Sequence, residues 1–346
     1  MKNLVFGAIV GLVLPLATNA QTIDLTIGTD QTLDPIYRDG LIQTLVDQSN
    51  NKIAQSGSSE SIKWNQQFDG SYFGFRYSVG AVETGLVDVA IGSSFWDHVR
   101  FPLQNVSYSA AFATGDLGEL VAAMNEIHAE YPKLNDAWST VDAVFLTAIG
   151  VPNYHLATNF PLSNVDDLMG RRILAPGPLA NWVRALGAVP VNGVESTYHG
   201  QLVAGQADGA ILPLSVYVSH EIHEPAPHLM LVGFGAQIDR ALIMGSDTWA
   251  RLSPGAQSAF VDLAVEFSTQ TTRKVMANEA AHMARLAELD VEINALGEQE
   301  RSDWANKVMA GFPAVEDEQV QADFDEIRAV LLAKLRERGQ TPLFDQ

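Results

Sequence analysis

Cysteine is absent from this chain of 346 residues. Its absence excludes disulfide bonds, a thiolate nucleophile and any metal site built from thiolates. A chain of this length can dispense with covalent cross-links because it can bury a large hydrophobic core. The length also favours two domains over one.

Positive charge is scarce. The chain has 21 lysine and arginine residues against 41 aspartate and glutamate residues, and its formal net charge is -20. A surface this negative is a poor partner for nucleic acids and anionic lipids, so we expect neither. An acidic surface of this kind also suits a medium of high salt concentration.

Long apolar runs are missing after the first twenty residues. The run from Leu4 to Leu16 follows Lys2 and precedes Thr18-Asn19-Ala20. This pattern predicts a signal peptide over residues 1–20, with cleavage after Ala20 and a mature chain that begins at Gln21. The alternative is an N-terminal anchor, but the run is too short to cross a bilayer comfortably. We expect an exported protein without stable membrane insertion.

Motifs of catalysis and of metal or phosphate binding are also missing. The stretch "GSSF" at 92–95 lacks the flanking glycine of a nucleophile elbow, and no glycine-rich phosphate loop is present. His220, His223 and His228 match no standard zinc spacing, and we interpret them as a solvated loop. We therefore predict no enzymatic activity, no cofactor and no bound metal.

The chain does contain a regular alternation of strands and helices. Strands are predicted over 22–29, 61–68 and 86–93, with helices over 36–54 and 71–85 between them. The third strand is a continuous apolar run, as in parallel strands that are buried on both faces. The alternation predicts an α/β domain with a parallel sheet.

The same pattern restarts at residues 143–151 and predicts a second α/β unit. Strands over 171–176, 188–191 and 207–213 alternate with helices over 179–187 and 196–205. A long helix is predicted from Pro254 to about Leu289, followed by a strand over 289–294 and helices over 298–309 and 320–338. Two α/β domains with short crossovers predict a cleft between them that binds a small ligand.

Several stretches, in a fixed order, resemble a known family. They are the signal peptide, "TIGTD", "VETGLVDVAIGSS", "NVDDLMGRRILAPG", "LGAVPVNGVESTYHGQLVAGQADGAILP" and "SDTWARLSPGAQSAFVDLA". Their order and spacing resemble the DctP-type substrate-binding subunits of tripartite ATP-independent periplasmic (TRAP) transporters. The resemblance covers most of the mature chain, although no single stretch is decisive.

The resemblance implies a two-domain periplasmic solute-binding protein fold (type II-like), with two α/β domains that close on a ligand and a long helix that spans both. It implies a monomer in the periplasm that delivers its solute to the small and large TRAP membrane subunits. The first domain would comprise 21–149 plus about 242–281, and the second 150–241 plus about 282–325. A C-terminal helix and tail would follow over 326–346.

The ligand clamp of this family is not matched. In the family, the strand after "DLxG" typically reads Gly-Leu-Lys-Ile-Arg-Val-Pro, and its arginine forms a two-pronged salt bridge with the ligand carboxylate. That arginine aligns with Leu174, and the preceding lysine aligns with Arg172. A second family arginine aligns with Pro152, and the asparagine of the family's "DGQENP" aligns with Leu212. We therefore expect a ligand that the usual clamp does not hold.

The same alignment places a mixed set of side chains in the cleft. The expected ligand-binding residues are Asp30, Gln67, Tyr72, Gly92, Ser93, Trp96 and Val194, with Tyr154, Trp182 and Tyr217 as further candidates. One carboxylate and several aromatic faces favour a cationic or a neutral, ring-bearing solute. For Trp182 and Tyr217 the alternative is core packing.

Three other functions stay open. An organic acid, the usual cargo of the family, could be held by an anion site moved to Arg172, Arg100, Arg240 or His155. The chain could also serve an ATP-driven importer or a sensor kinase. A periplasmic hydrolase is more remote, since it would need a nucleophile with a base in reach and no such pair is recognisable.

Overall fold

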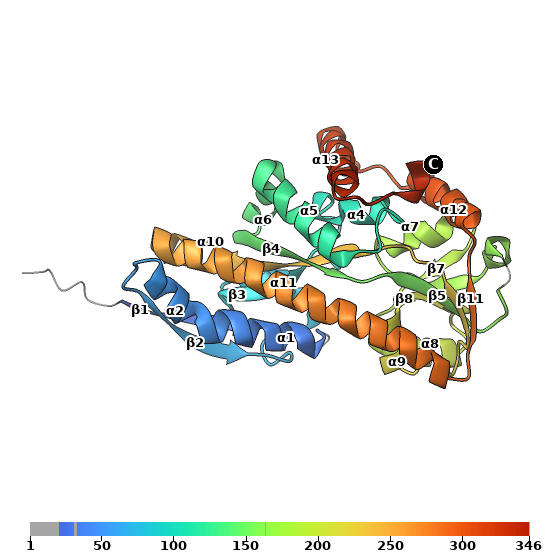
Figure 1. The fold of residues 1–346 in the computed structure, drawn as a ribbon, viewed down its shortest axis with the longest axis horizontal. Helices are drawn as coiled ribbons and strands as arrows, with labels where there is room; N and C mark the ends of the chain where they lie inside the picture. The colour runs from blue at the N-terminus through green and yellow to red at the C-terminus, as the bar shows by residue number, and fades with distance from the viewer. Residues whose placement is uncertain (1–20, 31–32, 163, 346) are drawn as a thin grey trace, which may run out of the picture.

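The computed structural model describes residues 21–30, 33–162 and 164–345 and consists of two α/β domains linked by a long helix (Figure 1). The predicted signal peptide over 1–20 lies outside the described residues. Within them, no helix is both long and apolar enough to cross a membrane.

The first domain is built on a five-stranded sheet in the order β2-β1-β3-β10-β4. The strands β1 (Thr22–Gly28), β2 (Ser61–Gln67) and β3 (Val89–Ser93) are parallel, as predicted. However, β10 (Gln237–Gly245) lies antiparallel between β3 and β4 (Ala143–Val151). The expectation of a purely parallel sheet is therefore wrong, because β10 enters this sheet on the return from the second domain.

Helices cover both faces of the first sheet. The predicted helix over 36–54 is present as α1 (Pro35–Leu41), a π-helical turn (Ile42–Val46) and α2 (Asp47–Gln55). The next predicted helix begins only at Phe75, with a 3-10 turn (Phe75–Tyr77) before α3 (Ser78–Glu83). The sequence pattern missed α4 (Val106–Ser109), α5 (Leu117–Glu130) and α6 (Lys133–Ser139), and α10 (Ser246–Arg251) completes the set.

The second domain has a six-stranded sheet in the order β11-β9-β5-β8-β6-β7. Strands β6 (Arg172–Leu174), β7 (Val189–Val191) and β8 (Gly209–Pro213) are parallel neighbours. The unpredicted strand β5 (Tyr154–Thr158) runs antiparallel to β8 and to β9 (His228–Leu231), and β9 pairs with β11 (Glu292–Ala295). The helices are α7 (Leu179–Arg184), α8 (Glu195–Val203) and α9 (Leu214–Ser219). Residues 143–151, where the pattern restarts, belong to the first sheet instead.

The chain passes between the two sheets three times. It crosses between β4 and β5, returns between β9 and β10, and crosses again along α11 (Pro254–Arg285). This helix has 32 residues, so it is about 48 Å long, and in Figure 1 it runs along both domains. It confirms the predicted long helix, and its Phe260, Leu263 and Phe267 are fully buried in the core of the first domain.

Helix α1 packs closely against α11 because residue 40 is glycine. A Cβ atom at Gly40 would lie 2.4 Å from Cγ2 of Thr271, too close for any side chain. After β11, α12 (Glu298–Gly311) packs on α7 of the second domain, and α13 (Glu318–Glu337) returns to α5 and α4 of the first. The region between the domains is thus bordered by both sheets and by α11.

Candidate ligand-binding site

A cavity of about 570 Å³ lies between the two domains. The first domain contributes the start of α1, the turn at Phe75, the loop after β3 and two residues of β10. The second contributes β5, β8 and the starts of α7, α8 and α9, and α11 closes one side. The charged or titratable side chains of this lining are Asp34, Tyr37, Tyr154, Glu195, Tyr198, His220, Asp239, Arg240 and Glu279.

Arg240 lies at the wall of the first domain and is already ion-paired. Its Nη1 is 3.2 Å from Oδ2 of Asp30, and its Nε donates to Oδ2 of Asp239 at 3.1 Å. Burial alone lowers the pKa of Arg240, but Asp239 and Asp30 outweigh this effect and raise the pKa above its usual value. The guanidinium is therefore permanently charged, and two carboxylates face it.

Only one carboxylate oxygen of Asp239 is engaged by Arg240. Burial raises the pKa of this carboxyl, against the attraction of Arg240. Its Oδ1 is buried and accepts no hydrogen bond among the described residues. Asp34, at the entrance to α1, is instead used as a helix cap, since its Oδ1 accepts from the backbone N–H of Ile36 at 2.8 Å.

Glu279 of α11 lines the side of the cavity that this helix closes. Both of its carboxylate oxygens are buried without a hydrogen-bond partner among the described residues, and Oε1 lies 3.8 Å from Nε2 of His155. Burial raises the pKa of Glu279 to about 7. Burial also lowers the pKa of His155 to about 4, helped by the charge of Arg301, so that imidazole is neutral at pH 7.

Glu195 is the first residue of α8 and faces the cavity from the second domain. Its side chain is exposed at the cavity wall. Desolvation by the surrounding protein raises the pKa of Glu195 to about 7; Arg240 opposes the shift and Asp239 adds to it. The charges of Arg240 and Asp239, on the first domain, thus act on the Glu195 carboxyl across the cleft.

An aromatic wall of Phe75, Phe95 and Trp96 completes the first-domain side. The Trp96 ring lies edge-on to Phe75 and to Phe95, with centroids 5.3 Å and 4.9 Å apart. The guanidinium of Arg76 lies over Trp96 at 4.9 Å from the ring centroid. The wall therefore already receives a cation on one aromatic face.

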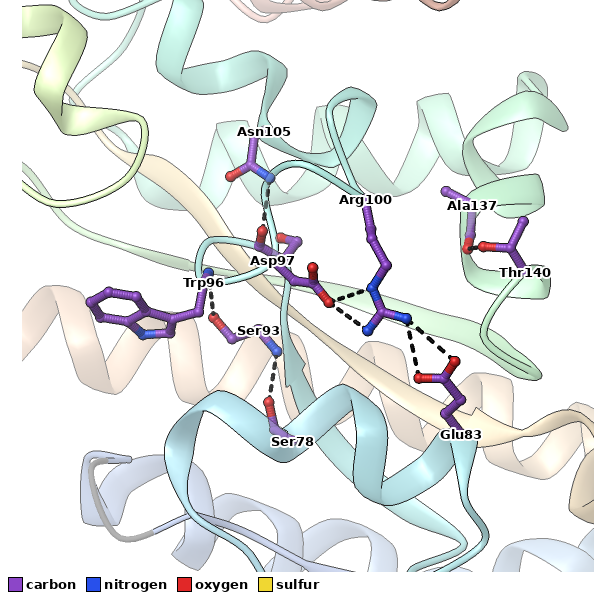
Figure 2. A network of polar contacts seen from close by, with 10 residues as sticks. Ser78, Glu83, Ser93, Trp96, Asp97, Arg100, Asn105, Ala137 and Thr140 are labelled. Carbon is purple, nitrogen blue, oxygen red and sulfur yellow. Dashed lines mark hydrogen bonds and ion pairs between the residues drawn. The ribbon is translucent and has the colours of Figure 1, made fainter.

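Figure 2 shows how the loop after β3 holds Trp96 in place. The backbone N–H of Trp96 donates to Oγ of Ser93 at 3.5 Å, and the N–H of Ser93 donates to Oγ of Ser78 at 3.1 Å. Asn105 fixes the other side of the loop by donating to the carbonyl of Ser94 at 2.9 Å. The indole points away from this network, which leaves it free to line the cavity.

Four of the predicted site residues line the cavity: Trp96, Pro152, Tyr154 and Val194. Asp30 is buried behind Arg240, and Gly92 and Ser93 lie in β3 beneath the Trp96 loop. Gln67 bonds to Asn65 and Ser71 at the surface, and Tyr72 is exposed. A role of these five in ligand binding stays a prediction.

The remaining predicted residues are packed in the second domain. Leu174 and Leu212 are fully buried in the same hydrophobic cluster and are not part of the cavity wall. The Trp182 indole donates to the carbonyl of Tyr108 at 2.8 Å and stacks on Phe234. The Tyr217 hydroxyl donates to the carbonyl of Ala226 at 3.1 Å. Both aromatic residues thus have the packing that core positions require.

The candidate anion sites differ in position. Arg172 pairs with Asp208 at 2.6 Å on the surface of the second domain, and Arg100 pairs with Asp97 and Glu83, as Figure 2 shows. Among the described residues of the cavity wall, Arg240 is the only arginine or lysine. The interpretation of His220, His223 and His228 as a solvated loop is wrong for two of them, since His228 begins β9 and His220 lines the cavity. No cluster of three metal-ligating side chains occurs in the described ranges.

Sequence reasoning missed Asp34, Glu195, Asp239 and Glu279. Glu195 directly follows the predicted Val194, so the alignment came within one residue of it. Asp239 lies in β10, a strand that the sequence pattern did not reveal. Glu279 has the appearance of an ordinary surface charge on a long helix, and no local signal distinguishes it from its exposed neighbours.

Two mixed α/β domains share one long helix and enclose a ligand-sized cavity between them. This arrangement defines the class of two-domain solute-binding proteins. Residues 66–316 match the model of the bacterial extracellular solute-binding protein family 7, DctP. The chain belongs to this family, and the resemblance inferred from the ordered motifs is confirmed.

Solved structures share this fold at low sequence identity. A TRAP periplasmic solute-binding protein from Desulfovibrio desulfuricans with bound sn-glycerol-3-phosphate has a TM-score of 0.71 and 12% identity, covering 92% of this chain and 98% of that one. A Roseobacter denitrificans protein with bound β-D-glucuronate has a TM-score of 0.70 and 15% identity, with 90% and 99% covered. A Bordetella pertussis receptor binding pyroglutamic acid has a TM-score of 0.68 and 15% identity, with 91% and 99% covered. They confirm the predicted two-domain fold.

Proposed function

We propose that the protein is the periplasmic solute receptor of a TRAP transporter. It captures one small organic solute in the interdomain cavity, closes around it and presents it to the small and large membrane subunits. The solute is cationic, or neutral with an aromatic or apolar part. No catalytic step is part of this function.

The observation that carries the ligand class is the charge of the cavity. Among the described residues, the carboxyl groups of Asp34, Glu195, Asp239 and Glu279 line it against one guanidinium, that of Arg240, which Asp239 and the buried Asp30 already neutralise. An anionic solute would enter against excess negative charge, whereas a cationic solute would reduce it. The departure of Leu174, Pro152 and Leu212 from the family's polar contacts supports the same conclusion.

The aromatic wall supports a solute with a flat or apolar part. Phe75, Phe95 and Trp96 offer ring faces and edges to the cavity, and Tyr154 faces them from the second domain. Aromatic rings attract cations as well as apolar groups. Because the two walls belong to different domains, a solute that contacts both stabilises the closed arrangement by its differential affinity.

A thermal-shift screen of the mature protein tests this proposal. The panel contains amines, neutral ring-bearing solutes and organic acids of similar size. A solute that binds only the folded protein stabilises it by about 2.7 kcal/mol at a hundredfold excess over Kd. We expect amines or neutral solutes to raise Tm and organic acids to have little effect. Stabilisation by acids alone would contradict the ligand class, though not the receptor function.

An organic-acid receptor is the second candidate. Arg240 lines the cavity, and its guanidinium stays protonated. The similar structures named above hold acids or a phosphate ester. In this case the ligand carboxylate would displace Asp239 from the guanidinium. The same screen decides between the candidates, because the displacement requires that acids bind more tightly than amines of the same shape.

A further inference from the structure

We propose that Glu195 binds the positively charged group of the solute, and that this group carries N–H donors, as an alkylammonium or guanidinium does. The inference rests on the proposed function, because it names the ligand chemistry of the same cavity. It assigns the cation to the second domain, whereas sequence reasoning placed the cleft carboxylate in the first, at Asp30.

Glu195 is the carboxylate of the cavity wall that is both accessible and uncommitted. Among the described residues its side chain has no hydrogen bond or ion pair, although it is exposed to the cavity. Asp34 caps α1, and Asp239 is paired with Arg240. Both oxygens of Glu279 are covered by protein. A cation that enters the cavity therefore finds its free carboxylate at Glu195.

The opposite wall makes the cavity favourable to a cation. Asp30 and Asp239 place two carboxylates around one guanidinium, and Oδ1 of Asp239, a residue that is 8% exposed, accepts no hydrogen bond in the described structure. This oxygen is covered by protein, as those of Glu279 are, so Asp239 acts on a cation in the cavity through its charge. Charge-assisted hydrogen bonds to the accessible Glu195 carboxylate need N–H donors, which a quaternary ammonium lacks.

The protonation of Glu195 agrees with this role. Desolvation by the surrounding protein raises the pKa of Glu195 to about 7. A cation beside the carboxylate favours the ionised form and reverses part of this shift. Of the titratable groups that face the cavity with Glu195, Arg240 lowers this pKa and Asp239 raises it.

A structural role of Glu195 needs a matched control. A glutamate in the first turn of a helix stabilises it through the helix dipole, with or without a ligand. Glu298 occupies the first position of α12, as Glu195 does in α8, and it is exposed outside the cavity. Glu298→Gln therefore removes the same charge from the same helical position, while the cavity stays intact.

The experiment is calorimetric titration of the wild type, Glu195→Gln and Glu298→Gln with benzylamine, benzyl alcohol and benzoate. These probes have one shape and carry a positive, a zero and a negative charge. We expect the wild type to bind benzylamine most tightly. Glu195→Gln should weaken benzylamine about tenfold to a hundredfold, with little effect on benzyl alcohol, and Glu298→Gln should change neither.

Each other outcome overturns a distinct statement. Equal benzylamine affinity in the wild type and Glu195→Gln, or no benzylamine binding at millimolar concentration in the wild type, overturns the assignment of Glu195. If the wild type binds benzyl alcohol in that case, the proposed function still holds with a neutral solute, and only the assignment of Glu195 is overturned. Preference of the wild type for benzoate overturns the ligand class of the proposed function itself. Equal losses in both variants would mean that the loss comes from removing a charge at a helix start rather than from a contact of Glu195 with the cation, and this result too overturns the assignment.

Discussion

The guanidinium of Arg240 and the carboxylate of Asp30 form an ion pair of 3.2 Å at the back of the interdomain cavity. Only 13% of the Arg240 side chain and 1% of the Asp30 side chain are exposed. Asp239 adds a second carboxylate at 3.1 Å. The pair joins the loop after β1 to β10, so it holds together the sheet that forms one wall of the cavity and neutralises the arginine before a solute arrives.

Asp30→Asn should therefore destabilise the fold. Removal of one partner from a buried ion pair leaves an uncompensated charge and typically costs about 3–5 kcal/mol. Asp239 still pairs with Arg240, so we expect a loss near the lower end of this range. Equilibrium unfolding in urea measures it. The control is Asp24→Asn, which removes the carboxylate of an exposed pair with Lys63 and should cost about 1 kcal/mol or less.

The same substitution should change the ligand preference. With Asp30 neutralised, Arg240 has one carboxylate partner instead of two and becomes a better anion site. We expect Asp30→Asn to bind benzoate more tightly than the wild type and benzylamine more weakly, measured by calorimetry. A variant that loses stability but keeps the wild-type preference would show that Asp30 acts only on the fold.

Glu279 predicts a pH dependence of folding stability. Its carboxyl has a pKa of about 7 in the folded protein, above its usual value of 4.5, so the folded state holds the proton more tightly. The stability that Glu279 contributes is complete below about pH 4.5 and is lost as the pH rises through about 7. A shift of this size corresponds to about 3 kcal/mol.

Comparison with Glu279→Gln isolates this effect from other titrating groups. Glutamine mimics the protonated carboxyl, so the two proteins should be similarly stable near pH 5, and the variant should be the more stable one above pH 7. Urea unfolding at several pH values gives the difference. Asp262→Asn, an exposed substitution on the same helix, should show no such trend. A difference that is constant with pH would contradict the buried state of Glu279.

Local patterns were sufficient for much of the fold. The strand at Thr22–Gly28 alternates buried and exposed residues, and β3 is a continuous apolar run, so each has a period that the sequence displays directly. The helix at Pro254–Arg285 has a Ser253 cap and a proline in its first turn, which mark its start. The strand β10 was missed, since its direction depends on a crossing between domains that no local pattern encodes.

The site was harder to predict, because it depends on which residues meet across the cleft. Trp96 and Val194 follow the ends of elements whose positions the alignment fixed, and both reach the cavity. Leu174 was expected there by alignment with the family's arginine; it is fully buried in β6, and its role in ligand binding stays a prediction. Glu279 can be recognised as a buried carboxyl of the cavity wall only from its neighbours in the folded structure.

The predicted processing after Ala20 leaves the first sheet intact. Strand β1 begins at Thr22, and the carbonyl of Gln21 accepts a hydrogen bond from the backbone N–H of Ser61 at 2.9 Å. We therefore expect periplasmic protein whose first residue is Gln21, measured by mass spectrometry of the intact chain. Material that retains residues 1–20 would contradict the predicted signal peptide.

Leu174→Arg tests whether the family's clamp can be restored at the aligned position. Leu174 is fully buried between β7 and β8 and packs in a cluster with Tyr198 and Leu202. Its Cδ2 lies so close to Gly193 that a Cβ atom built there would be 3.1 Å away, so the leucine packs against this loop. An arginine here would bury a charge without a partner, and we expect a loss of about 3 kcal/mol or more in the free energy of unfolding.

The matched control for this substitution is Leu174→Met, which keeps the volume and apolar character and should cost less than about 1.5 kcal/mol. Urea unfolding of the wild type and both variants gives the costs, and calorimetry with benzoate shows whether the new arginine reaches the cavity. A stable Leu174→Arg variant that binds benzoate would mean that this strand position does face the ligand, as in the family's clamp. We expect a variant that unfolds more readily and gains no benzoate binding, because other residues of the second domain form the cavity wall.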